Sequence, residues 1–93
     1  MRLDLFLKIS RLIARRSLAQ EFCDSGFISV NGLPAKSSKE LKVDDEIEIR
    51  RRNRVTKIIV VQIPDKKQMS KAGAEDLYRI VAEEVLIEQS PLT

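Results

Sequence analysis

The sequence predicts a small α+β protein in which two short helices pack on a mainly antiparallel sheet, followed by a C-terminal helix. Three observations predict this fold. Apolar residues recur at helical spacing in residues 2–24, whereas residues 27–63 contain alternating and β-branched runs separated by turn residues. Residues 72–88 return to helical spacing. The chain has 93 residues and is 43% hydrophobic but only 4% aromatic, which predicts one domain with a core of Leu, Ile and Val.

The first predicted helix covers residues 2–9. Leu3, Phe6, Leu7 and Ser10 share one face of it at helical spacing, which makes it amphipathic. A corner at residues 10–14 leads to a second helix over residues 16–24, which Gly26 ends in a left-handed conformation. The apolar stripe of this second helix consists of Leu18, Ala19, Phe22 and Cys23. Helices this short are marginal alone, so we expect them to pack on each other and on the sheet.

Four segments predict the strands of the sheet: residues 27–30, 33–36, 46–50 and 55–63. Asn31-Gly32, between the first two, is a strong signal for a tight turn. Pro34 cannot donate a backbone hydrogen bond, which predicts an edge position for the second strand, and Pro64 ends the fourth. Residues 37–45 predict a polar loop and residues 51–54 a basic turn.

The C-terminal third predicts a polar linker at residues 64–71 and a helix over residues 72–88. The apolar stripe of this helix consists of Ala74, Leu77, Ile80, Val81 and Val85. Its acidic residues are Glu75, Asp76, Glu83, Glu84 and Glu88. The predicted organisation is therefore a main domain at residues 1–63, a linker at residues 64–71, and a helix and tail at residues 72–93 that pack on or beside the sheet.

Positive charge is concentrated in the N-terminal two thirds of the chain. The net charge is +3, made up of +5 in residues 1–62 and −2 in residues 63–93. A basic surface attracts polyanions, nucleic acid first and acidic membrane surfaces second. No stretch approaches the roughly 20 apolar residues of a membrane span, and binding of the N-terminal amphipathic segment to a membrane surface is the least favoured alternative.

The residue types present argue against enzymatic catalysis and against metal binding. Cys23 is the single cysteine and the chain has no histidine, which excludes an intrachain disulfide and a zinc site. No histidine is available to activate Cys23, so a small buried group on a helix is favoured over a reactive thiolate. No nucleophile elbow, phosphate loop or metal-ligand spacing is present. We therefore expect no enzymatic activity, no metal and no cofactor, and a reducing cytoplasmic location.

The main candidate site is a set of cations on the first two helices. Its members are Arg2, Lys8, Arg11, Arg15 and Arg16. Arginine suits bidentate binding of phosphate, and Arg15 and Arg16 lie where the amides and dipole of the second helix also attract an anion. An ordinary solvated helix face is the alternative. RNA binding is favoured because side-chain cations are least stable at a helix N-terminus.

A second cluster lies at the predicted basic turn. Its members are Arg50, Arg51, Arg52, Arg54 and Lys57. RNA contact and a solvated turn that protects a sheet edge explain these charges equally well. Lys36, Lys39 and Lys42 are more typical of a solubilising surface, although Lys36 is kept among the candidate RNA-binding residues. The three phenylalanines fall on apolar stripes, which favours binding of folded or duplex RNA over base stacking.

Several segments closely resemble the S4-type RNA-binding domain, also called the alpha-L motif. These segments are Arg2-Leu3-Asp4, Arg16-Ser17-Leu18-Ala19, Gly26-Phe27-Ile28-Ser29-Val30-Asn31-Gly32 and Asp45-Glu46-Ile47. The resemblance covers roughly residues 1–63. Within that superfamily the chain is similar to the group of RqcP and the small heat-shock RNA-binding proteins, and its Ala74…Leu77-Tyr78 segment resembles their C-terminal helix.

This resemblance implies an RNA-binding accessory factor of the large ribosomal subunit in ribosome-associated quality control. Members of the group contact large-subunit rRNA and peptidyl-tRNA on stalled complexes, in one branch alongside a tail-elongation quality-control factor. Arg2 and Arg16 match the leading RNA contacts, followed by Arg11 and Arg15. We expect a monomer that does not bind membranes. The alternatives are a general structured-RNA-binding or ribosome-assembly adaptor, and a protein adaptor that docks through the acidic C-terminal helix.

The chain departs from the family pattern at three places. Leu5 stands where lysine is usual, which weakens the cationic set, and Arg15 replaces the usual Ser or Thr helix cap. Val43-Asp44 replaces the usual Pro-Gly before Asp45, and Asp tolerates the left-handed backbone that such a turn needs. None of these changes affects Arg2 or Arg16.

Overall fold

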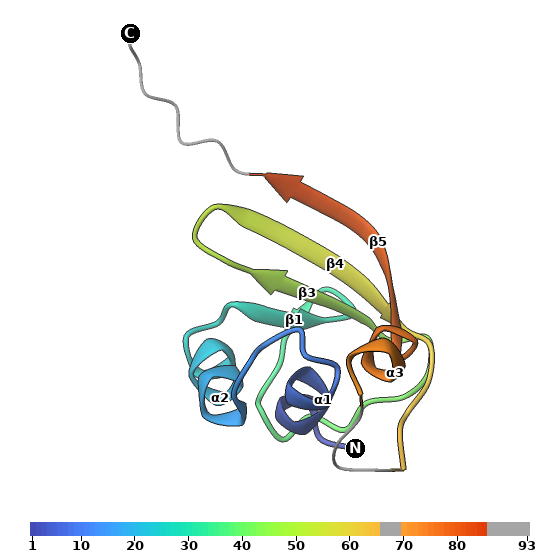
Figure 1. Ribbon diagram of the computed structural model, residues 1–93. Coiled ribbons are helices and arrows are strands. Elements are labelled where there is room, and N and C mark those ends of the chain that lie inside the picture. Colours follow the sequence, from blue (N-terminus) through green and yellow to red (C-terminus); the bar gives the residue numbers. More distant parts are fainter. Residues whose placement is uncertain (66–69, 86–93) are drawn as a thin grey trace, which may run out of the picture.

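The computed structural model describes residues 1–65 and 70–85. Five antiparallel strands form one sheet in the order β2-β1-β3-β4-β5. Figure 1 shows the three helices on one side of this sheet. The element bounds are α1 Leu3–Ile9, α2 Arg16–Asp24, β1 Ile28–Val30, β2 Leu33–Pro34, β3 Glu46–Arg50, β4 Arg54–Val60, α3 Lys71–Glu75 and β5 Tyr78–Val85. The predicted α+β class is confirmed, as are both N-terminal helices and the edge position of the Pro34 strand.

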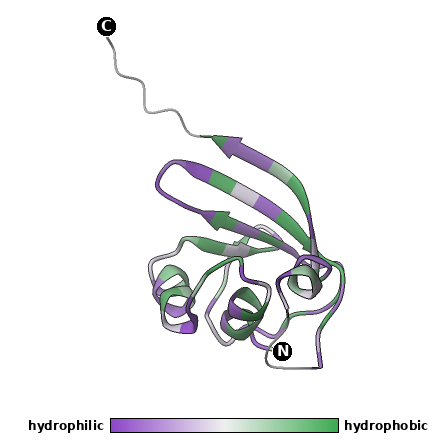
Figure 2. Cartoon of the chain, viewed as in Figure 1, coloured by the Kyte–Doolittle hydropathy of each residue, from purple (hydrophilic) through white to green (hydrophobic). Residues whose placement is uncertain are grey.

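The core lies between α1 and the helix-covered face of the sheet. From α1 it receives Leu3, Phe6 and Leu7, which are all fully buried. From the strands it receives Ile28, Ile47, Ile49, Ile58 and Val60. Along β3 the buried isoleucines alternate with polar residues, as the hydropathy colours of Figure 2 show, whereas in β4 the half-buried Ile59 lies between Ile58 and Val60. Leu, Ile and Val thus dominate the core, as the composition predicts, and Cys23 is buried in it as expected.

Two residues of the predicted N-terminal stripes are exposed, and one of them is Leu18 of α2, with 37% of its surface accessible. Phe27 is 44% exposed and meets Phe22 edge to face, with ring centroids 5.8 Å apart. Phe27 lies between the end of α2 and the start of β1 and belongs to neither element. Periodicity cannot place a residue at such a junction, because neither the helical nor the strand period applies there.

The predicted helix over residues 72–88 is wrong in extent. The helix α3 ends at Glu75, and residues 78–85 form the edge strand β5 instead. Residues 86–88 lie outside the described part of the chain. Ala74 and Leu77 are buried as predicted, but Ile80, Val81 and Val85 are 51%, 44% and 63% exposed. β4 would otherwise leave a row of backbone groups unpaired, and pairing with β5 satisfies them, so tertiary hydrogen bonding overrides the local helical period.

The tight turn between β1 and β2 has the geometry that its sequence predicts. Asn31 and Gly32 both have positive φ, at 53° and 85°. The Asn31 side-chain oxygen accepts a hydrogen bond from the Glu46 amide at 2.9 Å, and its amide group donates to the Asp45 carboxylate at 3.1 Å. Asp44 also adopts a positive φ of 78°, as expected where it replaces glycine. Asn31 therefore joins the turn to the start of β3.

Replacing Asn31 with alanine should lower the free energy of unfolding by about 2 kcal/mol, because the left-handed backbone becomes strained and both side-chain hydrogen bonds are lost. Asn31→Gly keeps that backbone accessible and should cost only about 1 kcal/mol. Chemical denaturation of the two variants measures the difference. Equal losses would argue against a contribution from backbone strain.

Candidate nucleic-acid interface

Arg2 and Arg16 are brought together by the carboxylate of Asp4. Arg2 precedes α1 and Arg16 begins α2, so the two helices supply one guanidinium each. Arg2 donates from Nε and Nη2 to the two Asp4 oxygens at 3.3 and 3.2 Å. The Arg16 Nε lies 3.4 Å from Asp4 Oδ2. The two leading candidates from the sequence therefore share one anionic partner.

The Asp4 carboxylate is fully buried and has two further donors. Gln20 of α2 donates to Oδ2 at 2.9 Å, and the Leu5 backbone amide donates to Oδ1 at 2.7 Å. Burial alone would raise the pKa of Asp4. The hydrogen bonds from Gln20, Leu5, Arg2 and Arg16 outweigh this effect and hold the pKa of Asp4 below its usual value. Asp4 is therefore a stable anion that fixes both guanidinium groups.

The two guanidinium groups remain open on their outer sides. Their side chains are 46% and 43% exposed, although the carboxylate between them has no solvent contact. Two cations around one anion leave net positive charge, so the pair can still attract a phosphate. Each arginine has five donor hydrogens and spends only one or two on Asp4. The exposed parts of both side chains therefore keep donors that Asp4 does not use.

The other three cations of this set lie at the start of α2 and around the end of α1. Arg15 is exposed at the N-terminus of α2 and provides no side-chain cap, as its departure from the Ser or Thr pattern predicts. It lies beside Arg16 and extends that cationic surface. Arg11 occupies the corner after α1 with a φ of 63°, and it lines a hollow of about 280 Å³ with Ser10, Lys71, Glu75 and Tyr78. Lys8 is half-buried in the last turn of α1.

The arginines of the predicted basic turn have different partners. Arg50 lies 4.0 Å from Glu48, and Arg54 lies 3.7 Å from Glu83 of β5. The half-buried Arg51 donates from Nη2 to the backbone carbonyl of Leu12. Arg51 thereby joins the β3–β4 turn to the corner between α1 and α2. Arg52 is exposed in that turn.

Lys36 lies in the loop that follows β2, close to the N-terminus of α1. The Ser37 carbonyl accepts a hydrogen bond from the Asp4 amide at 3.1 Å, and the Lys39 carbonyl accepts one from the Leu3 amide at 2.8 Å. An isolated bridge also pairs Arg2 with Glu40. The lysine loop is therefore attached to the segment that carries Arg2 and Asp4.

Sequence reasoning missed the structural roles of Asp4 and Gln20. A signal for Asp4 was available, because it is the only acidic residue among the first 20 and lies between apolar residues that face the core. A carboxylate at such a position needs partners. Gln20 follows Arg16 by one helical turn, which places both side chains on the same face of α2.

Asp4→Asn should lower the free energy of unfolding by about 2 kcal/mol at neutral pH, because the charged acceptor of several hydrogen bonds is lost. Folding lowers the Asp4 pKa, so the ionised carboxylate stabilises the native state above its unfolded-state pKa of about 3.9. This stabilisation disappears as the pH falls through the folded-state pKa, below that value. Urea denaturation from neutral to acidic pH should therefore show a larger loss in the wild type than in the variant; parallel curves would contradict this role.

Comparison with known proteins supports the S4 interpretation. Residues 1–47 match the S4 domain family model. The chain is 46% identical over 83 residues to the RQC P-site tRNA stabilizing factor of Streptococcus pneumoniae, covering 89% of this chain and 92% of that protein. It is also 46% identical over 87 residues to the protein of that name from Bacillus subtilis, covering 92% and 98%.

Two solved structures are similar in fold. The trimeric structure of Vibrio cholerae heat shock protein 15 superposes with a TM-score of 0.79 at 32% identity, covering 88% of this chain and 82% of that one. The solution structure of the hypothetical protein HP1423 gives a TM-score of 0.77, also at 32% identity, covering 88% and 98%. The chain therefore belongs to the S4 domain family, in the group that includes the RQC P-site tRNA stabilizing factors.

Proposed function

We propose that this protein binds the large ribosomal subunit carrying a stalled peptidyl-tRNA and stabilises the P-site tRNA during ribosome-associated quality control. The observation that carries this proposal is the Arg2–Asp4–Arg16 cluster within the S4 motif. Relatives that share 46% identity over most of their length are named for stabilising P-site tRNA. The protein acts by binding, through contacts with tRNA and rRNA.

The cluster is suited to this task because it is organised before RNA arrives. A free arginine side chain loses considerable rotamer entropy when it binds a phosphate. Asp4 already restricts Arg2 and Arg16, so less entropy remains to be lost. The donors that Asp4 does not use can then grip phosphates on neighbouring nucleotides in a fixed spacing, which favours folded RNA of matching shape.

A factor that joins tRNA to rRNA needs two cationic surfaces. Arg15 and Arg16 provide one at the start of α2, and the β3–β4 turn with Arg50 and Arg52 provides another. Arg51 holds that turn against the corner that follows α1, through the Leu12 carbonyl. We assign the first surface to one RNA and the turn to the second. Arg51 then acts mainly by positioning the turn.

The proposed role requires neither a catalytic step nor a bound cofactor. We propose that the protein acts as a cytoplasmic monomer, and that a tail-elongation quality-control factor works on the same ribosomal complex. Among the described residues, no helix has the length and apolar character needed to cross a bilayer.

A ribosome-assembly adaptor acting through protein partners is the second candidate. The edge strand β5 favours it, because Ile80, Val81 and Val85 are exposed there beside Glu83 and Glu84. An exposed strand edge can pair with a strand of another protein. Deletion of residues 72–93 removes this strand. Loss of function with full ribosome association would support the adaptor role.

Removing the guanidinium groups of Arg2 and Arg16 should abolish co-sedimentation with large ribosomal subunits. Because Arg2→Ala with Arg16→Ala leaves the Asp4 charge buried without its cations, a second variant adds Asp4→Asn and removes that charge too. Circular dichroism establishes that the triple variant is folded. Arg79→Ala is the matched control, since Arg79 is exposed on β5 and opposite Ile59, which faces away from the helices. Retained binding by the folded triple variant would refute this site.

The salt dependence of binding measures how many phosphates the cluster contacts. Each lost contact should reduce the slope of log affinity against log salt concentration by about 1. Single Arg2→Ala and Arg16→Ala variants should therefore show flatter slopes than the wild type, and the Arg79→Ala control should not. An unchanged slope with weaker binding would mean that the two arginines act through the fold.

A further inference from the structure

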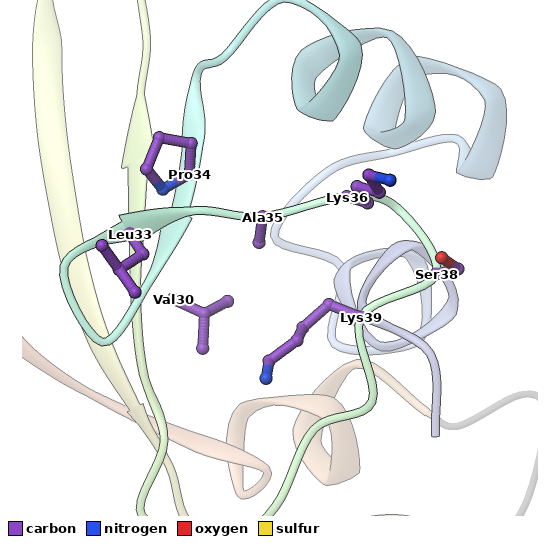
Figure 3. Close-up of a pocket in the computed structure, with 7 residues that line it drawn as sticks. All are labelled: Val30, Leu33, Pro34, Ala35, Lys36, Ser38 and Lys39. Atoms are coloured by element: carbon purple, nitrogen blue, oxygen red, sulfur yellow. The ribbon is translucent and has the colours of Figure 1, made fainter.

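A small hollow lies beside the edge strand β2 and is not used by the phosphate-binding cluster. It measures about 290 Å³, and its lining residues are Val30, Leu33, Pro34, Ala35, Lys36, Ser38 and Lys39. Figure 3 shows Leu33 and Pro34 along one end and the Lys39 side chain extending toward Val30. Leu33 is 70% exposed, more than any other large apolar side chain in the described residues. The hollow therefore presents an apolar floor with cations at its rim.

The hollow is lined by a lysine loop that is hydrogen-bonded to the segment carrying Arg2 and Asp4. The backbone of its lysine loop accepts hydrogen bonds from Leu3 and Asp4, at the Lys39 and Ser37 carbonyls respectively. The loop and the N-terminus of α1 thus form one hydrogen-bonded unit. An RNA held by Arg2 would pass beside this loop.

The lining chemistry selects one kind of occupant. Among the described residues, two lysines and no carboxylate line the hollow, which favours an anionic ligand. A bare phosphate would not use the apolar floor, because Leu33, Pro34 and Ala35 offer no side-chain donor. A volume near the lower limit of about 300 Å³ for ligand pockets suits a single base. An unstacked nucleotide combines a flat apolar surface with a phosphate and so matches both features.

We propose that this hollow receives one unstacked nucleotide of the bound RNA. The base lies on Leu33 and Ala35, which alternate onto the same side of the chain, and the ammonium group of Lys39 binds its phosphate, with Lys36 adding positive charge at the rim. This proposal rests on the proposed function, since Arg2 and Arg16 hold the RNA beside the loop. The protein would then recognise folded RNA in which one base is turned out of its helix.

Two paired comparisons on purified large ribosomal subunits test the proposal. Leu33→Ser removes the apolar contact, and Val43→Ser is its control, because Val43 is 50% exposed and does not line the hollow. Lys36→Ala with Lys39→Ala removes the cations, and Lys42→Ala is the control. We expect the hollow variants to bind about five- to tenfold more weakly and the controls to bind like the wild type.

A titration of the full chain with adenosine monophosphate, cytidine monophosphate or inorganic phosphate tests the site directly. Nuclear magnetic resonance should show shifts in the methyl groups of Val30, Leu33 and Ala35 with at least one nucleotide, and none with phosphate. Identical responses to phosphate and nucleotide would overturn the base contact. Weaker ribosome binding by Leu33→Ser with no nucleotide response would indicate a protein partner and also overturn it.

The two proposals fail in different ways. If the Arg2 and Arg16 variants lose ribosome binding while every hollow variant binds normally, the nucleotide site is wrong and the proposed function stands. If the Arg2 and Arg16 variants bind normally, the proposed RNA surface is wrong. In that case the nucleotide titration still reports on the hollow independently.

Discussion

The buried carboxylate of Asp4 is the interaction on which the proposed RNA-binding surface depends. Taking an anion out of water is costly unless hydrogen bonds replace its hydration. Donors from both helices do so here, with Gln20 and Arg16 from α2 and the Leu5 amide from α1. The same contacts that stabilise the anion fix the positions of the two guanidinium groups. The contacts of Asp4 therefore join the two helices and position the two arginines at the same time.

Hydrogen bonds join the N-terminal motif to two segments that lie far from it in the sequence. The Lys36–Lys39 loop is hydrogen-bonded to the start of α1, and the β3–β4 turn reaches the corner after α1 through Arg51. Cations far apart in the sequence thereby become neighbours of known arrangement. A folded polynucleotide holds its phosphates at fixed spacing, so donors at a matching fixed spacing lose less conformational entropy when they bind it.

The edge strand β5 shows that apolar residues at helical spacing do not always form a helix. Ala74, Leu77, Ile80, Val81 and Val85 fit a helical stripe, yet only the first two face the core. Ile80 and Val81 are β-branched, which suits either structure, and the unpaired edge of β4 decided between them. Chain segments that compete for the same backbone partners cannot be resolved from local spacing, because the partner lies elsewhere in the sequence.

The sequence by itself predicted the helices at residues 2–9 and 16–24, the Asn31-Gly32 turn and the aliphatic core, since these follow from local spacing and backbone preference. It also marked Arg2 and Arg16 through their resemblance to the S4 motif. Only the tertiary structure placed both arginines on one buried carboxylate, divided the Arg50–Arg54 cluster between Glu48, Leu12 and Glu83, and placed residues 78–85 of the predicted C-terminal helix in the edge strand β5. Those outcomes depend on distances between segments far apart in the chain, and such distances are fixed only when the whole core packs.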